Sequence, residues 1–208
     1  MKQEKVWDEI APLWNEYKVE KAVRKTGLID EFVEKKDKKV LDLGCGSGRN
    51  FFKIEGFDGI IYGVDFSKEM LKLAEKNAEK LDIKVELIRA NVYDLPFENN
   101  FFDKVIFFAT LHCIKGKEKR IKTLNELYRV LKPKGQALIT VWNKSSKRWK
   151  NKSKEIKAGW AIKNKRVERY YYLYDYDELK GELESVGFKI VRHNFVESAR
   201  NIILIVEK

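Results

Sequence analysis

The chain has 208 residues, of which 44% are hydrophobic and 36% are charged, and this balance excludes both a disulfide-stapled peptide and a disordered tail. Its two cysteines and two histidines lack the spacing of zinc ligands, so we expect no metal site. No apolar run approaches roughly 18 residues, and the first residues contain no apolar signal segment, so we expect a cytoplasmic protein with no membrane partner. The length predicts one domain over residues 1–208.

The formal net charge of +11 is concentrated in one segment. Residues 142–169 contain eleven Lys or Arg and two Glu, a net charge of +9, with three tryptophans interspersed among them. Because this stretch shows little amphipathic periodicity, we predict a mobile basic loop over about 143–165. Abundant Lys and scarce Gln are typical of heat-adapted proteins, in which such charges are often only solvated, but this clustering favours a nucleic-acid partner.

The predicted elements follow one another in a regular order along the chain. Residues 4–35 have apolar residues at helical spacing and predict one or two N-terminal helices. Short β-rich runs then alternate with helical stretches, which indicates βαβ units and a parallel sheet. The runs are 39–43, 59–64, 83–88, 102–108 and 136–142, and the helices are 49–54, 67–81 and 117–131. After the basic loop we predict a packed strand or base-stacking segment at 170–174, a helix at 176–186, and a hairpin of strands 188–195 and 201–206.

This order predicts a Rossmann-like α/β fold. We expect a seven-stranded, mostly parallel sheet with helices on both faces and one antiparallel strand. In such a sheet, ligands bind beyond the carboxyl ends of the strands. The residues at those ends are therefore the candidate site.

A glycine-rich turn follows the first predicted strand. Gly44, Gly46 and Gly48 come between this strand and a predicted helix, so backbone N–H groups can approach a ligand closely. The spacing is GxGxG, and Asp42 at the strand end disfavours a pyrophosphate but suits an ammonium group. Asp65 ends the next strand, where a carboxylate can accept hydrogen bonds from both ribose hydroxyls.

The third strand leads to Asn91, where an adenine edge would lie. Acid, glycine turn, acid and amide at successive strand ends describe a site for a nucleoside that carries an amino acid. Asn91 also has an alternative as an ordinary turn residue. We further expect cofactor contacts from residues in or beside these strand ends, namely Cys45, Phe66, Val92 and Phe108.

The sequence resembles the class I S-adenosylmethionine-dependent methyltransferases. The matching segments are LDLGCGSG at 41–48, GVD at 63–65, ANVYDLPF at 90–97, FFDKVIF at 101–107 and ELYRVLKPKGQALIT at 126–140. The resemblance implies S-adenosylmethionine as cofactor and methyl transfer as the reaction.

A narrower resemblance is to the tRNA wobble-uridine carboxyl methyltransferases. It rests on WDEIAP at 7–12, GQALI with Val141 and Trp142, the segment 169–171, and Arg200-Asn201 before an apolar strand. It implies methylation of the carboxylate of 5-carboxymethyluridine in tRNA, with a small zinc-binding activator protein as partner. The predicted edge strand at 82–89 could accept an added strand from such an activator.

A carboxylate acceptor is ionised at neutral pH and needs no general base. The candidates for holding this anionic substrate are Arg200, Arg169, Lys18 and His112, assisted by Asn201. Two other functions stay open: a methyltransferase for a small metabolite, and a non-catalytic cofactor-binding subunit of an RNA-binding complex. Trp7 and Trp14 fit core packing, with a lid over the cofactor as the alternative.

Overall fold

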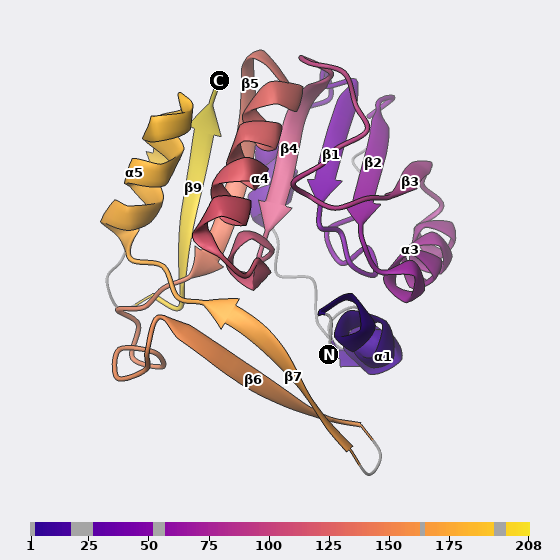
Figure 1. Ribbon diagram of the computed structural model, residues 1–208. Coiled ribbons are helices and arrows are strands. Elements are labelled where there is room, and N and C mark those ends of the chain that lie inside the picture. Colours follow the sequence, from indigo (N-terminus) through magenta and orange to yellow (C-terminus); the bar gives the residue numbers. More distant parts are fainter. Residues whose placement is uncertain (1–2, 18–26, 52–56, 163–164, 194–198) are drawn as a thin grey trace.

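The computed structural model describes residues 3–17, 27–51, 57–162, 165–193 and 199–208. Its centre is a seven-stranded sheet in the order β3-β2-β1-β4-β5-β9-β8 (Figure 1). The strands are β1 (Lys39–Leu43), β2 (Ile60–Asp65), β3 (Val85–Arg89), β4 (Phe102–Phe108), β5 (Leu131–Trp142), β8 (Lys189–His193) and β9 (Asn201–Glu207). Only β9 runs antiparallel to its neighbours, so the predicted fold class is confirmed.

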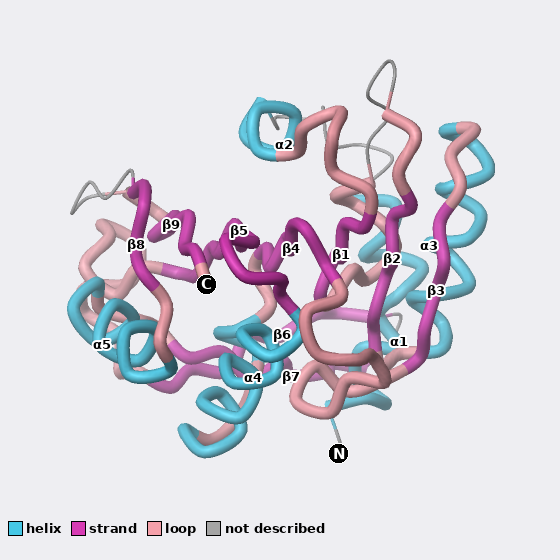
Figure 2. The backbone as a smooth tube through the Cα atoms, turned by 90° about the horizontal axis from the view of Figure 1, so that it is seen from above, coloured by secondary structure: helices cyan, strands magenta, loops and turns pink. Residues whose placement is uncertain are grey.

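Helices lie on both faces of the sheet (Figure 2). They are α2 (Gly27–Phe32) and α3 (Lys68–Leu81) on one face and α4 (Lys117–Val130) and α5 (Tyr176–Val186) on the other. The N-terminus of α3 is capped by the Ser67 hydroxyl, which accepts a hydrogen bond from the Met70 N–H at 3.1 Å. The helix predicted at 49–54 is not seen, because residues 49–50 lie in a turn, and 52–56 are outside the described residues.

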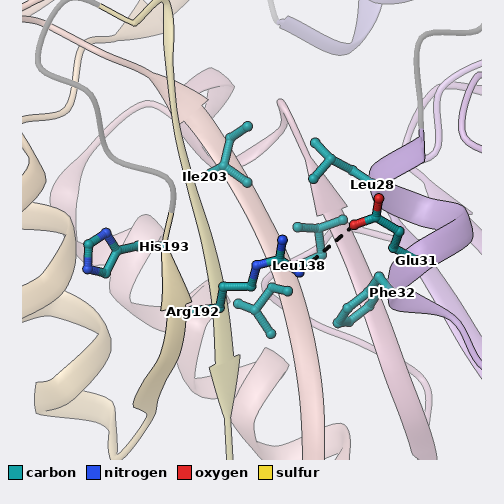
Figure 3. A pocket seen from close by; sticks show the side chains of 8 residues that line it. Leu28, Glu31, Phe32, Leu138, Arg192, His193 and Ile203 are labelled. Atoms are coloured by element: carbon teal, nitrogen blue, oxygen red, sulfur yellow. Dashed lines mark ion pairs between the residues drawn. The ribbon is translucent and has the colours of Figure 1, made fainter.

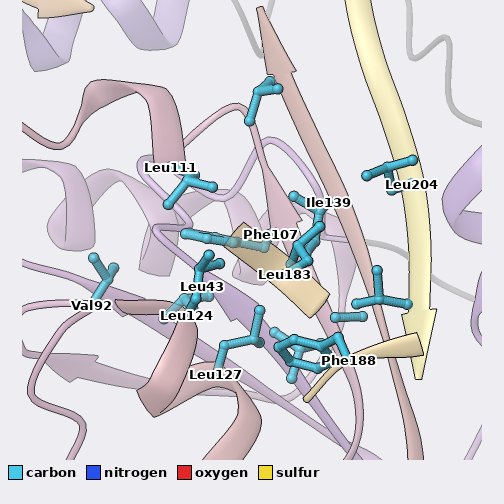
Figure 4. Packing of buried hydrophobic residues seen from close by; sticks show 14 of the residues in the cluster. Leu43, Val92, Phe107, Leu111, Leu124, Leu127, Ile139, Leu183, Phe188 and Leu204 are labelled. Carbon is cyan, nitrogen blue, oxygen red and sulfur yellow. The ribbon is translucent and has the colours of Figure 1, made fainter. Parts of the chain in front are cut away.

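Two apolar layers hold the helices to the sheet. The central strands are buried on both sides, as expected for parallel strands covered twice. On the α4/α5 side, Leu124, Leu127 and Leu183 pack against Phe107 and Ile139 of the sheet (Figure 4). This packing fixes the strands in register, and it leaves their carboxyl ends free to carry polar groups.

The helix α1 (Gln3–Asn15) and a separate hairpin lie together beyond the carboxyl ends of the parallel strands (Figure 1). The hairpin consists of β6 (Glu155–Ile162) and β7 (Lys165–Tyr172). Val167 of β7 packs with Val6 and Ile10 of α1. The Gln3 side chain also bonds the β7 backbone, donating to the Glu168 carbonyl at 3.4 Å and accepting from the Tyr170 N–H at 3.1 Å.

This hairpin corrects the prediction of a basic loop over 143–165. The structure shows turns followed by strand β6 across residues 155–162, so the loop prediction is wrong there. The cause is local: Trp160 and Ile162 alternate with the more exposed Ala161 and pack with α1, as does Val167 of β7. Among the described helices, none is long and apolar enough to cross a bilayer.

Candidate functional site

The glycine turn after β1 is held against β2 by backbone hydrogen bonds. The N–H groups of Gly44 and Cys45 both donate to the Val64 carbonyl, at 2.8 and 2.9 Å. At Gly46, φ is +53°, and a Cβ would meet only the Met70 sulfur at 3.9 Å. A side chain at Gly46 would therefore project into open space beside the turn, so glycine leaves room for a ligand there. At Gly48, by contrast, a Cβ would collide with the Phe51 ring at 2.5 Å, which is a packing reason for glycine.

Two buried carboxylates lie under this turn. Asp42 accepts a hydrogen bond from the Asn50 amide at 3.1 Å through Oδ1, while its Oδ2 has no hydrogen-bond partner among the described residues. Burial raises the pKa of Asp42 to about 7, and the nearby Asp65 adds to the increase. A cationic group beside Oδ2 would satisfy this atom and favour the ionised form.

Asp65 is positioned by two backbone donors. Its Oδ2 accepts from the Gly46 N–H and its Oδ1 from the Ser67 N–H, both at 2.9 Å. Burial raises the pKa of Asp65 to about 6, against the effect of these two hydrogen bonds. The Asp65 carboxylate is thus fixed in orientation at the end of β2, where it can accept further hydrogen bonds from a ligand.

The turn opens into the first of two adjacent cavities, here called the glycine-loop cavity. It has about 630 Å³ of empty space, part of it open to solvent. Its lining includes the predicted contacts Gly44, Cys45, Gly46, Asp65, Phe66 and Phe108. Trp7 and Trp14 of α1 also line it. The helix α1 therefore covers a ligand site as well as packing against the hairpin.

The second cavity, here called the arginine cavity, shares Trp7, Trp14, Arg49, Phe108, Ala109 and Cys113 with the first. It has about 680 Å³ of empty space and adds His112, Trp142, Tyr171, Arg200 and Asn201. Arg49 and Arg200 lie at its mouth, where both side chains are exposed. Surrounding protein atoms and the positive charge of Arg200 both lower the pKa of Arg49, and no acidic residue is among the described residues that line the cavity.

Stacked rings lie beside the arginine cavity, and three of them, His112, Trp142 and Tyr171, line it. Trp142 stacks on Tyr171 at 4.2 Å between ring centroids, on Trp149 at 4.9 Å and on His112 at 5.0 Å. We call these four residues the aromatic column. His112 is buried, and burial lowers its pKa to about 3, so its ring is neutral at physiological pH. His112 can therefore offer a hydrogen bond or a flat surface, but not a positive charge.

The cysteines at these cavities are poor nucleophiles. Burial raises the pKa of Cys45 well above its usual value and that of Cys113 to about 12. Both thiols stay protonated near neutral pH. Their small side chains are sufficient reason for their places in the lining.

Among the predicted site residues that the structure describes, five are not in the lining of either cavity: Asp42, Gly48, Asn91, Val92 and Arg169. Asn91 is exposed after β3 and pairs with Asp94 in a short bridge, and Val92 is buried in the core. Arg169 is buried among the rings of Trp7, Trp14, Trp160 and Tyr171, at 4.8 to 5.8 Å. Lys18 is outside the described residues. The roles assigned to Asn91, Val92, Arg169 and Lys18 stay predictions.

Sequence reasoning missed Arg49 and Trp142 as parts of the site, and it did not predict that Trp142 stacks on the predicted site residue His112. Arg49 directly follows the glycine turn, and this position was the available signal. Trp142 and Tyr171 were visible as residues of predicted strands, but nothing in the sequence indicates that their rings stack. Their convergence depends on the path of the hairpin.

A third cavity lies elsewhere, on the α2 face of the sheet (Figure 3). Leu28 and Phe32 of α2 approach Leu138 of β5 there, and Arg192 of β8 pairs with Glu31 at 3.9 Å. Its lining includes none of the strand-end residues described above. We therefore assign no part of the reaction to it.

The fold and the two adjacent cavities define an α/β protein with a ligand site at the carboxyl edge of its parallel strands. Residues 34–181 match the family model described as a methyltransferase domain, and the chain belongs to this family. It is an S-adenosylmethionine-dependent methyltransferase.

Relatives with different acceptors share this domain. The chain is 32% identical to the ubiquinone/menaquinone biosynthesis C-methyltransferase UbiE of Haemophilus ducreyi, over 76% of this chain and 67% of that protein. It is 30% identical to the tRNA (carboxymethyluridine(34)-5-O)-methyltransferase of Arabidopsis thaliana, over 66% of this chain but only 32% of that protein. An S-adenosylmethionine-dependent methyltransferase from Clostridium acetobutylicum shares the fold, with a TM-score of 0.70, 17% identity and coverage of 97% and 98%.

The residues present fit the cofactor S-adenosylmethionine. The unpartnered Oδ2 of Asp42 suits its ammonium group, Asp65 suits its ribose hydroxyls, and the open space at Gly46 allows close approach to the backbone. When bound, S-adenosylmethionine supplies a methyl group on a positively charged sulfur. The arginine cavity adjoins the glycine-loop cavity and shares six lining residues with it.

Proposed function

We propose that this methyltransferase acts on an anionic acceptor, the carboxylate of a carboxymethyl-type modified uridine at the wobble position of tRNA. The observation that carries the proposal is the pair Arg49 and Arg200 at the mouth of the arginine cavity, with no acidic residue in the described lining. Two guanidinium groups that repel each other are stabilised by an anion between them, and their forked donors match a carboxylate.

The absence of a strong base in the described lining supports an acceptor that is already ionised. A free carboxylate has a pKa near 4 and needs no proton removed before it reacts. His112 has a pKa of about 3 and is a weak base, unsuited to removing a proton from a neutral carbon or nitrogen acceptor.

The chemistry is then one displacement. Bound S-adenosylmethionine would supply the methyl group to a carboxylate oxygen of the acceptor, with a methyl ester and a neutral thioether as the two products. Arg49 and Arg200 orient the carboxylate, and Trp7 and Trp14 exclude water from the reacting atoms. Asn201 lies in the same lining and can donate to the acceptor.

Two further observations support tRNA as the acceptor. The net charge of +9 over residues 142–169 suits a polyanion, and the aromatic column offers flat surfaces beside the cavity for a base.

The edge strand β3 has a neighbour on one side only, so an activator protein could add a strand there. The UbiE relative makes a ring-bearing small molecule the second candidate, for which the aromatic lining alone would suffice.

The test is mass spectrometry of nucleosides from tRNA treated with the protein and methyl-labelled cofactor, with and without a zinc-binding activator. We expect label in a carboxymethyl ester, and an Arg49→Met, Arg200→Met double variant should lose at least tenfold in rate. The matched control is Arg192→Met, because Arg192 is an exposed arginine remote from both cavities. Label in a neutral small molecule, with tRNA unlabelled, would overturn the proposal.

A further inference from the structure

The outer side of the β6–β7 hairpin, the side turned away from α1, forms a wide groove. We call it the hairpin groove and define it by Lys115, Trp149, Lys152, Lys157, Arg166 and Tyr170. Its empty space, including the part open to solvent, is about 1240 Å³, compared with about 630 Å³ for the glycine-loop cavity. Such an open groove suits an extended ligand better than an enclosed small molecule.

The charge of this groove is positive and largely unneutralised. Four exposed cations line it, with Glu155 as the one acidic residue in the described lining. Lys157 pairs with Glu168 at 3.4 Å, whereas Lys115, Lys152 and Arg166 form no ion pair with the described residues. Since these three come from different segments of the chain, the fold itself brings their charges together.

Arg166 lies flat across the hairpin because its neighbour is a glycine. Gly159 pairs with Glu168, two residues from Arg166 on β7, and a Cβ on Gly159 would come within 2.0 Å of the Arg166 Nε and 2.5 Å of its Cζ. Glycine in a strand costs roughly 0.5–1 kcal/mol relative to alanine, and here it makes room for the guanidinium. A flat guanidinium offers both forked donors for a phosphate and a face for stacking on a base.

The aromatic column connects this groove with the acceptor site. Trp149 lines the hairpin groove, and its ring stacks at 4.9 Å on Trp142, which lines the arginine cavity. A nucleotide in the arginine cavity would therefore have the groove beside it, on the other side of two stacked indoles. This position fits the chain that continues from that nucleotide.

We propose that the hairpin groove binds backbone phosphates of the RNA substrate next to the nucleotide in the arginine cavity, an inference that rests on the proposed function. The assignment is selective within the basic segment. Lys154 is excluded, because its ammonium group contacts Asp175 and Glu178, both at 2.8 Å. Lys115, Lys152 and Arg166 carry the binding.

The test compares two triple variants that lose the same charge. The first is Lys115→Ala, Lys152→Ala, Arg166→Ala, and the control is Lys35→Ala, Lys76→Ala, Lys189→Ala, whose lysines are exposed and line neither the groove nor the two cavities. Binding of labelled tRNA is measured by fluorescence anisotropy across a salt series. Each lost phosphate contact reduces the slope of log affinity against log salt by about 0.7 to 0.9.

We expect the groove variant to bind tRNA at least tenfold more weakly than the parent, with a slope shallower by about 2 to 3 for three contacts, and the control to keep the slope of the parent. If the two triple variants bind tRNA with equal slopes and affinities, the hairpin groove does not bind RNA phosphates. The same result is expected if the ligand of the groove is an acidic protein, and it would overturn the proposal. Methylation of free 5-carboxymethyluridine separates the two proposals. If the parent methylates the free nucleoside and the groove variant binds tRNA like the control, only the proposal for the hairpin groove is wrong. If the parent labels no carboxylate but tRNA binding depends on the groove, only the proposed acceptor is wrong.

Discussion

Replacing Asp42 with Asn is expected to stabilise the cofactor-free protein and to weaken cofactor binding. Burial raises the pKa of Asp42 from 3.8 to about 7, so the folded protein disfavours the ionised form. The pKa of the folded state exceeds that of the unfolded state, so the stability contributed by this group is present below pH 4 and is lost as the pH rises through about 7. Asn is neutral throughout, and Asn50 can still donate to its side-chain oxygen.

The size of the effect follows from the pKa difference. At about 1.4 kcal/mol per pKa unit, ionisation of Asp42 lowers the free energy of unfolding by up to about 4 kcal/mol at pH 8. For a chain of this size, each kcal/mol corresponds to roughly 2–4 °C in Tm, so Asp42→Asn should raise Tm at pH 8 by several degrees and at pH 4 by little. The lost charge should weaken S-adenosylmethionine binding roughly 10- to 100-fold at pH 8, as for a charge-assisted hydrogen bond.

Urea unfolding at pH 4 and pH 8 measures the first effect, and calorimetric titration with S-adenosylmethionine measures the second. The control is Asp94→Asn, which changes an exposed carboxylate outside both cavities. A variant that is less stable than the parent at pH 8 would refute the raised pKa of Asp42, and a variant that binds the cofactor as tightly as the parent would refute the assignment of Asp42 to the ammonium group.

Two further substitutions test the cofactor site. Gly46→Val should reduce cofactor affinity at least 100-fold in a folded protein, because the side chain fills the open space beside the turn. The control is Gly116→Val, which is also at a positive φ and whose Cβ would have no atom within 4 Å, and it should leave cofactor affinity unchanged. Calorimetry measures the affinity of both variants, and circular dichroism shows whether they are folded. Asp65→Ala should weaken S-adenosylmethionine binding by roughly 1–3 kcal/mol without creating affinity for NAD, and calorimetry with both ligands would contradict this assignment if NAD bound more tightly.

The sheet could be predicted because each strand is a short β-rich run between helical stretches. Lys39–Leu43 and Phe102–Phe108 are examples whose observed bounds match the prediction. The hairpin was missed because its many lysines obscure the alternation of apolar and exposed residues, such as Trp160 and Ile162 on either side of Ala161. Charge density was mistaken for loop character, although a strand with one solvated face has many charges.

The cofactor half of the site was more predictable than the acceptor half. Asp42 and Asp65 follow their strands directly, so the topology alone brings them to one edge. Arg49 and Arg200 are 151 positions apart, and no local sequence pattern predicts that both line the opening of the arginine cavity. Asn91 shows the limit of the rule, because it follows its strand as predicted and yet lies exposed outside the two cavities.

The positions of the five tryptophans make intrinsic fluorescence a reporter of ligand binding in this protein. All five tryptophans are at the carboxyl edge of the sheet: Trp7 and Trp14 line both cavities, Trp142 and Trp149 belong to the aromatic column, and Trp160 lies 5.8 Å from Trp14. Intrinsic emission excited at the indole band therefore arises entirely at the functional end. Binding of cofactor, acceptor and RNA can each be followed by the change in tryptophan fluorescence, without a label. The cavity on the α2 face has no tryptophan in its described lining, so binding there should not change this signal.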